Sequence, residues 1–161
     1  MKRTTSSKSD TTITAGTEQF PIEIRYAYAS FRGYYPYDPF KKNQDDVAIT
    51  APFAGGPNDA LFSVYDGHGQ TGHDCAAFAR KNLPRLSEKY IRQARVKAYR
   101  EKLKQEGKLD GAKLYDPLMW PYLEPQELQD CFQKAHLDCN SDMHNSTEVR
   151  LKKLHVELLV G

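Results

Sequence analysis

The sequence predicts a mixed α/β (α+β) fold, about three strands followed by two helices. Residues 22–65 contain short runs rich in β-branched and aromatic residues, which are typical of strands. From residue 73 onward such runs are rare and helix propensity is high. With 161 residues, 39% of them hydrophobic and 27% charged, the chain has the size and composition of one globular domain.

Three segments have the character of strands. Residues 22–31 (IEIRYAYASF) alternate between the two faces of a half-buried strand. Residues 47–50 (VAIT) predict a short second strand, and residues 60–65 (ALFSVY) predict a third. The third is apolar almost throughout, which predicts a central position in a sheet. A glycine and two prolines within residues 33–45 predict a loop between the first two strands.

Two helices are predicted in the second half of the chain. Small and apolar residues at 76–83 can open the first helix, and Pro84 would kink it or limit it. Strong helix formers then continue as far as Gly107, a residue type that commonly follows a helix end. The second helix covers residues 125–144. Its predicted apolar face consists of Leu128, Phe132, Ala135 and Cys139.

The first 19 residues differ in composition from the rest of the chain. They are rich in serine and threonine, and they contain one isoleucine and no aromatic residue. Such a segment buries too little apolar surface to offset the entropy lost on ordering it. We therefore expect residues 1–19 to be a disordered tail and the folded part to begin at residue 20.

Charge and cysteine content exclude several classes of protein. The net charge is +2, from 23 basic residues scattered among 21 acidic ones, so neither a nucleic acid nor a membrane is expected as a partner. No apolar stretch is long enough to span a membrane. Three cysteines without CxxC spacing indicate free thiols. These features predict a soluble intracellular protein, cytoplasmic or nuclear, and they leave its oligomeric state open.

The segment LFSVYDGHGQTGH (residues 61–73) carries the main candidate site. Asp66 ends an apolar strand and precedes a Gly-His-Gly turn. Glycine lets a ligand approach the backbone closely, so the carbonyl of Gly67 could coordinate as well. Asp45 stands before the neighbouring strand, and antiparallel pairing of the two strands would bring both carboxylates to one edge of the sheet. Mg²⁺ and Mn²⁺ prefer such carboxylate and carbonyl oxygens.

A purely structural interpretation of these residues stays open at this point. Asp-Gly is a common turn dipeptide after a strand. On this interpretation His68 caps the turn, and Asp45 flanks the start of a strand without any functional role. The residue types alone fit both a turn and a metal site.

The order of two motifs favours the functional interpretation. KKNQDDVAIT (residues 41–50), a spacer and LFSVYDGHG (residues 61–69) resemble the first two signature motifs of the metal-dependent serine/threonine phosphatases of the PP2C (PPM) family. The family pattern is an acidic motif such as Asn-Gln-Asp, a strand, and then Phe-x-Val-x-Asp-Gly-His-Gly. RGYYPYDPFKKNQD (residues 32–45) is similar to a subgroup of plant and protist members. The resemblance covers residues 26–92 and, less clearly, 124–144.

The resemblance implies a β-sandwich of two central antiparallel sheets flanked by helices, incomplete in this chain, and dephosphorylation of phosphoserine and phosphothreonine proteins. Asp66 would bridge two Mg²⁺ or Mn²⁺ ions, and Gly67 would offer its carbonyl to one of them. Asp45 would face the ions through bound water. The ions would activate a shared water for attack on phosphorus. His68 would protonate the departing serine or threonine oxygen as general acid.

Several positions depart from the family pattern. Phe40 occupies the place of an arginine that grips the substrate phosphate in many members, so the adjacent Lys41 is the expected phosphate contact, as a point charge. Gln44 stands where many members have glutamate. The downstream aspartates that complete the family's metal site have no counterpart here. We therefore expect residues 20–144 to be the N-terminal portion of a phosphatase domain, and residues 145–161 a divergent tail.

The missing aspartates leave two further hypotheses open. The chain would be a non-catalytic fragment or pseudophosphatase that binds phosphoproteins or other partners, or it would be a truncated part of a longer product. An incomplete sandwich would expose apolar strand faces, which predicts poor solubility or aggregation. A zinc site formed by His136, Cys139 and His144 is a weaker interpretation, because packing of the second helix already explains the cysteine.

Overall fold

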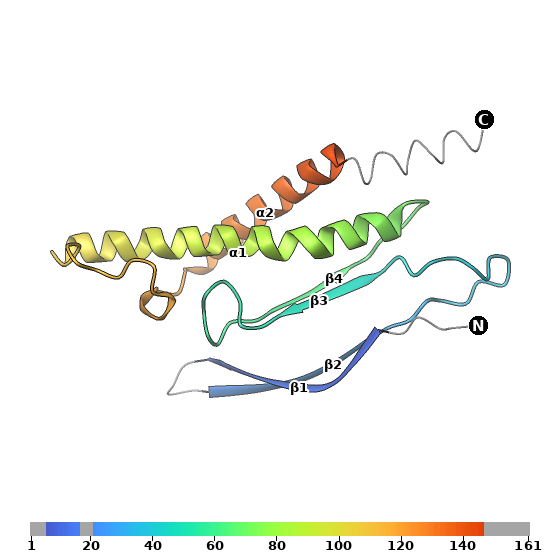
Figure 1. Ribbon diagram of the computed structural model, residues 1–161, viewed down its shortest axis with the longest axis horizontal. Coiled ribbons are helices and arrows are strands. Elements are labelled where there is room, and N and C mark those ends of the chain that lie inside the picture. The colour runs from blue at the N-terminus through green and yellow to red at the C-terminus, as the bar shows by residue number, and fades with distance from the viewer. Residues whose placement is uncertain (1–5, 17–20, 147–161) are drawn as a thin grey trace.

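The computed structural model describes residues 6–16 and 21–146 of the chain. The elements are, in order, β1 (Ser6–Gly16), β2 (Pro21–Ser30), β3 (Asp46–Thr50), β4 (Leu61–Tyr65), α1 (Gly72–Gln105), the short 3₁₀ helix η1 (Pro117–Met119) and α2 (Pro125–Asn145). The fold class is α+β, as the sequence predicts, because the strands come first and the helices follow (Figure 1).

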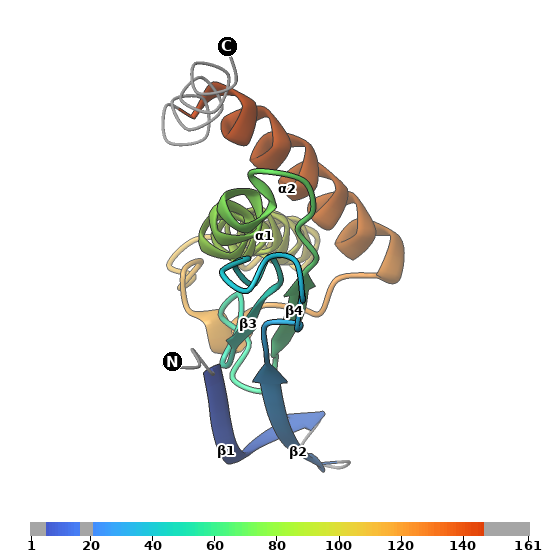
Figure 2. The same ribbon diagram turned by 90° about the vertical axis from the view of Figure 1, so that its right-hand side faces the viewer.

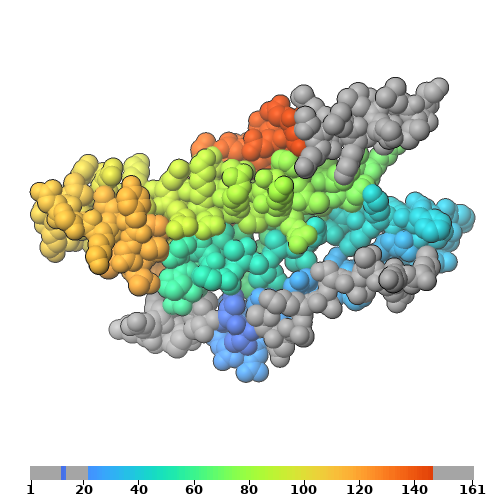
Figure 3. Space-filling model, viewed as in Figure 1, coloured from blue at the N-terminus to red at the C-terminus, as the bar shows by residue number. Residues whose placement is uncertain are grey.

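The elements are stacked around α1 (Figure 2). α2 crosses one side of α1, and β3 and β4 lie on its opposite side. The β1–β2 hairpin lies beyond β3 and β4, away from the helices. In the space-filling view, the loop before β3 and the loop after α1 lie at opposite ends of the molecule (Figure 3). α1 is therefore the central element of the fold.

Within the described residues, the four strands form two separate antiparallel pairs. The β3–β4 ladder is regular, and it runs from Asp46 opposite Tyr65 to Thr50 opposite Leu61. β1 and β2 pair along their length with one irregularity in register. The three predicted strands are confirmed as β2, β3 and β4, and each begins and ends within one residue of its predicted position.

The presence of β1 corrects the prediction of a disordered tail over residues 1–19. Ser6–Gly16 is a strand that pairs with β2. The prediction rests on the low apolar content of the segment. The run TTIT (residues 11–14), however, consists of β-branched residues, which favour strands. Pairing with β2 also satisfies backbone hydrogen-bonding groups, a gain that composition does not measure. Residues 1–5 and 17–19 lie outside the described part of the chain.

A second correction concerns β4, which is not the central strand that its apolar run predicts. Among the described residues it pairs with β3 only. Tyr65 is buried, whereas Val64 is 78% and Phe62 45% exposed. The Phe62 ring meets the Tyr26 ring edge-on, with 5.0 Å between their centroids, so the β1–β2 hairpin covers part of that face. Among the described residues, one face of β4 therefore packs at Tyr65, the hairpin contacts the other face at Phe62, and no second strand pairs with β4.

α1 is one continuous helix of 34 residues. Pro84 lies inside it and does not end it, although the sequence allowed for a limit there. A proline removes only one hydrogen bond of the helix, and the packing of α1 against its neighbours on both sides supports the remaining turns. The buried side chains from the middle of α1 onward recur every four residues: Ser87, Ile91, Arg95, Tyr99 and Leu103.

The C-terminus of α1 confirms the predicted glycine cap. Gly107 has a φ of +67°, which glycine adopts without a steric penalty. The Lys108 amide donates to the Leu103 carbonyl (2.9 Å), and the Gly107 amide donates to the Lys104 carbonyl (3.1 Å). These are the two hydrogen bonds of a Schellman motif, which satisfies carbonyls that the helix end leaves without partners.

α2 packs its predicted apolar face toward α1. Ala135 and Cys139 are buried in one core cluster with residues of α1. Leu128 and Phe132 pack against a second cluster that includes buried Cys131, which the sequence pattern missed. The predicted helix is thus confirmed in both its position and its buried face.

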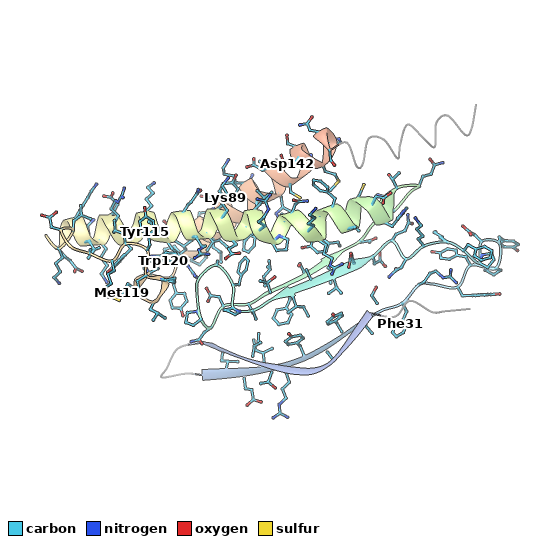
Figure 4. The ribbon with its side chains drawn as sticks, viewed as in Figure 1. Phe31, Lys89, Tyr115, Met119, Trp120 and Asp142 are labelled. Atoms are coloured by element: carbon cyan, nitrogen blue, oxygen red, sulfur yellow. The ribbon has the colours of Figure 1, made fainter. Side chains whose placement is uncertain are left out.

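The loop between the helices folds along α1. Tyr115, Met119 and Trp120 lie beside the C-terminal half of α1 (Figure 4). Trp120 Nε1 donates to the Leu114 carbonyl at 2.8 Å, which closes the loop on itself.

Two other expectations concern membrane-spanning helices and the C-terminal tail. No helix in the described part is long and apolar enough to cross a lipid bilayer. Residues 147–161, nearly all of the predicted divergent tail, lie outside the described residues.

Candidate functional site

β3 and β4 bring the two predicted metal-binding aspartates to the same end of the sheet. Asp45 immediately precedes β3, and Asp66 immediately follows β4. Because Asp46 pairs with Tyr65, continuing the register by one residue sets Asp45 opposite Asp66. Both side chains are exposed. The antiparallel pairing expected from the sequence is therefore confirmed, and it forms an acidic edge open to solvent.

The two neighbouring aspartates Asp45 and Asp46 have different environments. The Asp46 carboxylate accepts from the Val47 amide at 2.8 Å through Oδ1. Its Oδ2 lies 3.4 Å from Arg80 Nη1 on α1. Asp46 therefore ties β3 to α1, whereas Asp45 projects its carboxylate into solvent. The structure thus separates a structural aspartate from a candidate ligand.

The glycine loop after Asp66 is packed tightly against residue 44. A Cβ added at Gly67 would lie 2.3 Å from the Gly72 carbonyl oxygen and 2.4 Å from that of Gln44. Gln44 Nε2 also donates to the Gly69 carbonyl. Only glycine fits at position 67, so the loop is held in one shape between β4 and α1. In the sequence Gln44 stands out only as a departure from the family pattern, and the spacing of Gly67, Gly69 and Gly72 is the one signal of this clamp.

His68 and Lys41, the predicted acid and phosphate contact, occupy different surroundings. His68 is exposed in the glycine loop, two residues after Asp66. The Lys41 ammonium lies 3.9 Å from the centroid of the Tyr35 ring, a cation–π distance. Lys41 is thus held by the aromatic loop that leads into β3, and its contact in this structure is with Tyr35.

Basic residues connect this region to the start of α1. Lys42 Nζ lies 3.0 Å from His73 Nε2, with the lysine as donor. His73 Nε2 lies 3.4 Å from a carboxylate oxygen of Asp74. The Lys42–His73 contact joins the first turn of α1 to the segment before β3 and gives the His73 ring a partner within the protein.

Tyr65, the residue before Asp66, plays a structural part. Its hydroxyl donates to Ser63 Oγ at 2.9 Å. Burial raises the pKa of the Tyr65 phenol above its ordinary value of 10.0, which extends to higher pH the range in which it is a donor. The last residue of β4 is therefore anchored beneath α1, and this anchoring fixes where Asp66 leaves the strand.

The predicted metal ligands Asp45 and Asp66 offer carboxylate oxygens at the same end of the β3–β4 sheet, and Gly67 directly follows Asp66. Such oxygens are hard ligands of the type that Mg²⁺ and Mn²⁺ prefer. Among residues 6–16 and 21–146, no group of three or more His, Cys, Asp or Glu side chains is arranged to hold a metal ion. The described residues therefore fit such an ion in ligand chemistry but supply fewer side-chain ligands than an enclosed site.

Two residues of the alternative zinc site, Cys139 and His136, have other contacts in α2. Cys139 is 4% exposed and belongs to the core between α1 and α2. Burial raises the pKa of its thiol, which disfavours the thiolate that zinc binds. His136 Nδ1 lies 2.7 Å from the Phe132 carbonyl on its own helix.

An ion pair between the buried Arg95 and the part-buried Asp59 is not among the features that the sequence predicts. Arg95 Nη2 donates to Asp59 Oδ2 at 2.5 Å, and Nη1 donates to the Ala54 carbonyl at 3.3 Å. The pair fastens the turn between β3 and β4 to α1. Its signal was the charged residue in the buried stripe of α1, four residues after Ile91 and four before Tyr99.

Comparison with known proteins gives a short but significant similarity. No protein-family model matches the chain, and no solved structure matches it. A curated Arabidopsis thaliana protein, "Probable protein phosphatase 2C 35", is 43% identical over 62 residues. The match covers 38% of this chain and 18% of that protein, so the chain spans less than a fifth of that relative's length. Over the matched segment, the similarity supports a relationship with the protein phosphatase 2C family.

Proposed function

We propose that this chain carries part of the catalytic site of a metal-dependent protein serine/threonine phosphatase. The observation that carries the proposal is the β3–β4 register, which sets Asp45 opposite Asp66 at an exposed sheet edge. The 43% identity to a protein named as a phosphatase 2C supports it independently. The substrates would be phosphoserine and phosphothreonine proteins.

Each site residue has a role that its position supports. Asp45, Asp66 and the Gly67 carbonyl would hold Mg²⁺ or Mn²⁺ at the sheet edge. Such ions, when bound, supply positive charge that stabilises a reacting phosphate and lowers the pKa of water. His68, exposed in the same loop, would protonate the leaving serine or threonine oxygen. Lys41 would exchange its contact with Tyr35 for the substrate phosphate.

A second candidate is a non-catalytic module that binds phosphorylated partners. The partial donor set favours it, since no group of three or more potential metal-binding side chains forms among the residues that the structure describes. Lys41 and Lys42 would then hold a phosphate by charge alone.

Manganese binding and turnover separate the two candidates. We would titrate the protein with Mn²⁺, following loss of the free-ion paramagnetic resonance signal, and assay Mn²⁺-dependent hydrolysis of a phosphoserine peptide. Asp66→Asn is the test variant, and Asp142→Asn, an exposed carboxylate on α2, is the matched control (Figure 4). Binding and hydrolysis that are lost in Asp66→Asn and retained in Asp142→Asn support the phosphatase. Peptide binding without hydrolysis supports the module, and the absence of both metal and peptide binding overturns both proposals.

A further inference from the structure

The loop between β2 and β3 exposes a group of large aromatic side chains. The exposed aromatic residues of this loop are Phe31, Tyr34, Tyr35, Tyr37 and Phe40. Tyr34, Tyr37 and Phe40 are each at least 82% exposed. Aromatic side chains supply large contact areas at binding surfaces, and a contiguous exposed apolar patch commonly marks an interaction site. The aromatic loop, residues 31–42, is therefore a candidate binding surface.

The aromatic loop is held in shape by contacts at its neck and within it. Asn43 Nδ2 donates to Ser30 Oγ at 2.6 Å, which closes the neck. The Asp38 amide donates to the Tyr35 carbonyl and the Lys41 amide donates to the Asp38 carbonyl, both at 3.2 Å. Lys41 Nζ also lies over the Tyr35 ring. A loop that is closed and packed by its own contacts loses less entropy when it binds a partner.

The aromatic loop lies beside the acidic edge of the β3–β4 sheet. It extends beyond the end of the sheet at which α1 begins (Figure 1). Phe40 precedes Asp45 by five residues, and a chain of that length spans at most about 18 Å. An extended peptide with its phosphate at the acidic edge would therefore reach the aromatic loop within roughly five residues.

Charge and residue type favour a phosphorylated peptide over a lipid surface as the partner. Three basic residues, Arg32, Lys41 and Lys42, outnumber the one acidic residue of the loop, Asp38, so the loop attracts phosphate. Asp38 directly follows the fully exposed Tyr37, and a carboxylate at this point opposes insertion into a bilayer. Tyrosines combine apolar contact area with a polar hydroxyl, which is typical of protein-binding surfaces.

We propose that the aromatic loop selects phosphoserine and phosphothreonine peptides that carry an aromatic side chain within about five residues of the phosphate. This selection rests on the proposed function, because it places the phosphate at the acidic edge. The aromatic ring of the peptide packs against Tyr34, Tyr37 and Phe40, whose rings are exposed. Aromatic pairs in edge-to-face or offset contact gain more than their buried area alone provides, so an aromatic residue is preferred over an aliphatic one.

Three labelled phosphoserine peptides of otherwise equal sequence measure this selection with the whole chain. One carries phenylalanine four residues before the phosphoserine, one carries it four residues after, and the third has alanine at both positions. Fluorescence anisotropy in the presence of Mn²⁺ gives their affinities. We expect one phenylalanine peptide to bind about tenfold more tightly than the alanine peptide. Equal affinities for all three peptides would overturn the proposal.

Variants of exposed tyrosines assign the preference to the aromatic loop. Tyr34→Ser combined with Tyr37→Ser removes two of its rings and should reduce the preference from about tenfold to about one. Tyr115→Ser removes an exposed ring at the opposite end of the molecule and should retain the full preference (Figure 4). Circular dichroism checks that each variant is folded. A preference that survives in the double variant, or that is lost in Tyr115→Ser, contradicts the proposal.

Hydrolysis and self-association separate the remaining outcomes. Hydrolysis of all three peptides with equal kcat/KM would overturn the selection and leave the phosphatase proposal standing. A loop-dependent preference without hydrolysis supports the selection and assigns it to the non-catalytic module. Self-association in sedimentation that disappears in the double tyrosine variant would show that a second copy covers the loop. Binding to phosphatidylserine vesicles that disappears in the same variant would assign the loop to a membrane. Either of these last two results would overturn the proposal.

Discussion

Asp46 lies directly opposite Tyr65 at the last rung of the β3–β4 ladder. The Asp46 carboxylate forms an ion pair with Arg80 of α1, and the Tyr65 side chain is buried beneath the same helix. The two residues immediately beyond the pair, Asp45 and Asp66, are exposed. The pairing thus converts two motifs that are distant in sequence into one acidic edge.

This register predicts a specific cross-link. Opposite residues of antiparallel strands have Cα atoms roughly 4.5–5.5 Å apart, a separation that a disulfide can bridge. Asp45→Cys combined with Asp66→Cys should therefore form an intrachain disulfide on mild oxidation, detected by peptide mapping and mass spectrometry. Asp45→Cys combined with His68→Cys is the offset control. Equal cross-linking in both double variants would contradict the register.

The glycine loop predicts losses of stability of different size for alanine substitutions at Gly67 and Gly69. Gly67→Ala places a Cβ against two backbone carbonyls, so we expect it to lower the free energy of unfolding by about 2–3 kcal/mol. Gly69→Ala has open space around the new Cβ and carries only the strain of a φ of +78°, about 1 kcal/mol. Urea denaturation of the two variants measures the difference. A larger loss for Gly69→Ala would show that the loop is not clamped by Gln44.

The Asp59–Arg95 ion pair predicts that substitution of Arg95 clearly lowers the free energy of unfolding. Arg95→Met removes the charged hydrogen-bond partner of the part-buried Asp59 and of the Ala54 carbonyl, and losing such a partner costs about 1.5–3 kcal/mol. Arg100→Met removes an exposed arginine from the same helix and should change stability by less than about 0.5 kcal/mol. Urea midpoints of the two variants give the comparison. Similar midpoints would mean that the pair contributes little to the fold.

The elements that the sequence predicts are those that local chemistry determines. β2, β3, β4 and α2 follow from periodicity and propensity, which act over a few residues. The end of α1 follows from the special backbone freedom of Gly107. In each case the residues that specify the element lie within the element itself or next to it.

The features that the sequence did not predict depend on partners far along the chain. β1 is a strand because it pairs with β2, although its composition alone indicated disorder. Arg95 is buried because Asp59, distant in sequence, meets its charge. Gln44 acts as a clamp only once β3 and β4 are paired, when its side chain reaches the Gly69 carbonyl. Long-range pairing is not encoded in any local window.

A hydrogen bond between the helices predicts a pH dependence of stability. The Tyr90 hydroxyl of α1 donates to the Asp138 carboxylate of α2. This bond lowers the pKa of Asp138 below its ordinary value of 3.8, with burial opposing it and the charge of Lys134 adding to it. A carboxyl group whose pKa is depressed in the folded state contributes stability above its unfolded pKa, and this stability is lost as pH falls through the folded pKa.

The same bond raises the pKa of Tyr90 above 10.0. Its contribution to stability is therefore present below the unfolded phenol pKa and is lost as pH rises through the folded value. Tyr90→Phe should be less stable than wild type between these limits, and the difference should shrink both below pH 3.8 and above pH 10.0. Urea midpoints measured across this pH range test the expectation, with Tyr115→Phe, exposed in the loop after α1, as the control. Parallel curves for wild type and Tyr90→Phe would show that the Tyr90–Asp138 hydrogen bond does not contribute to stability.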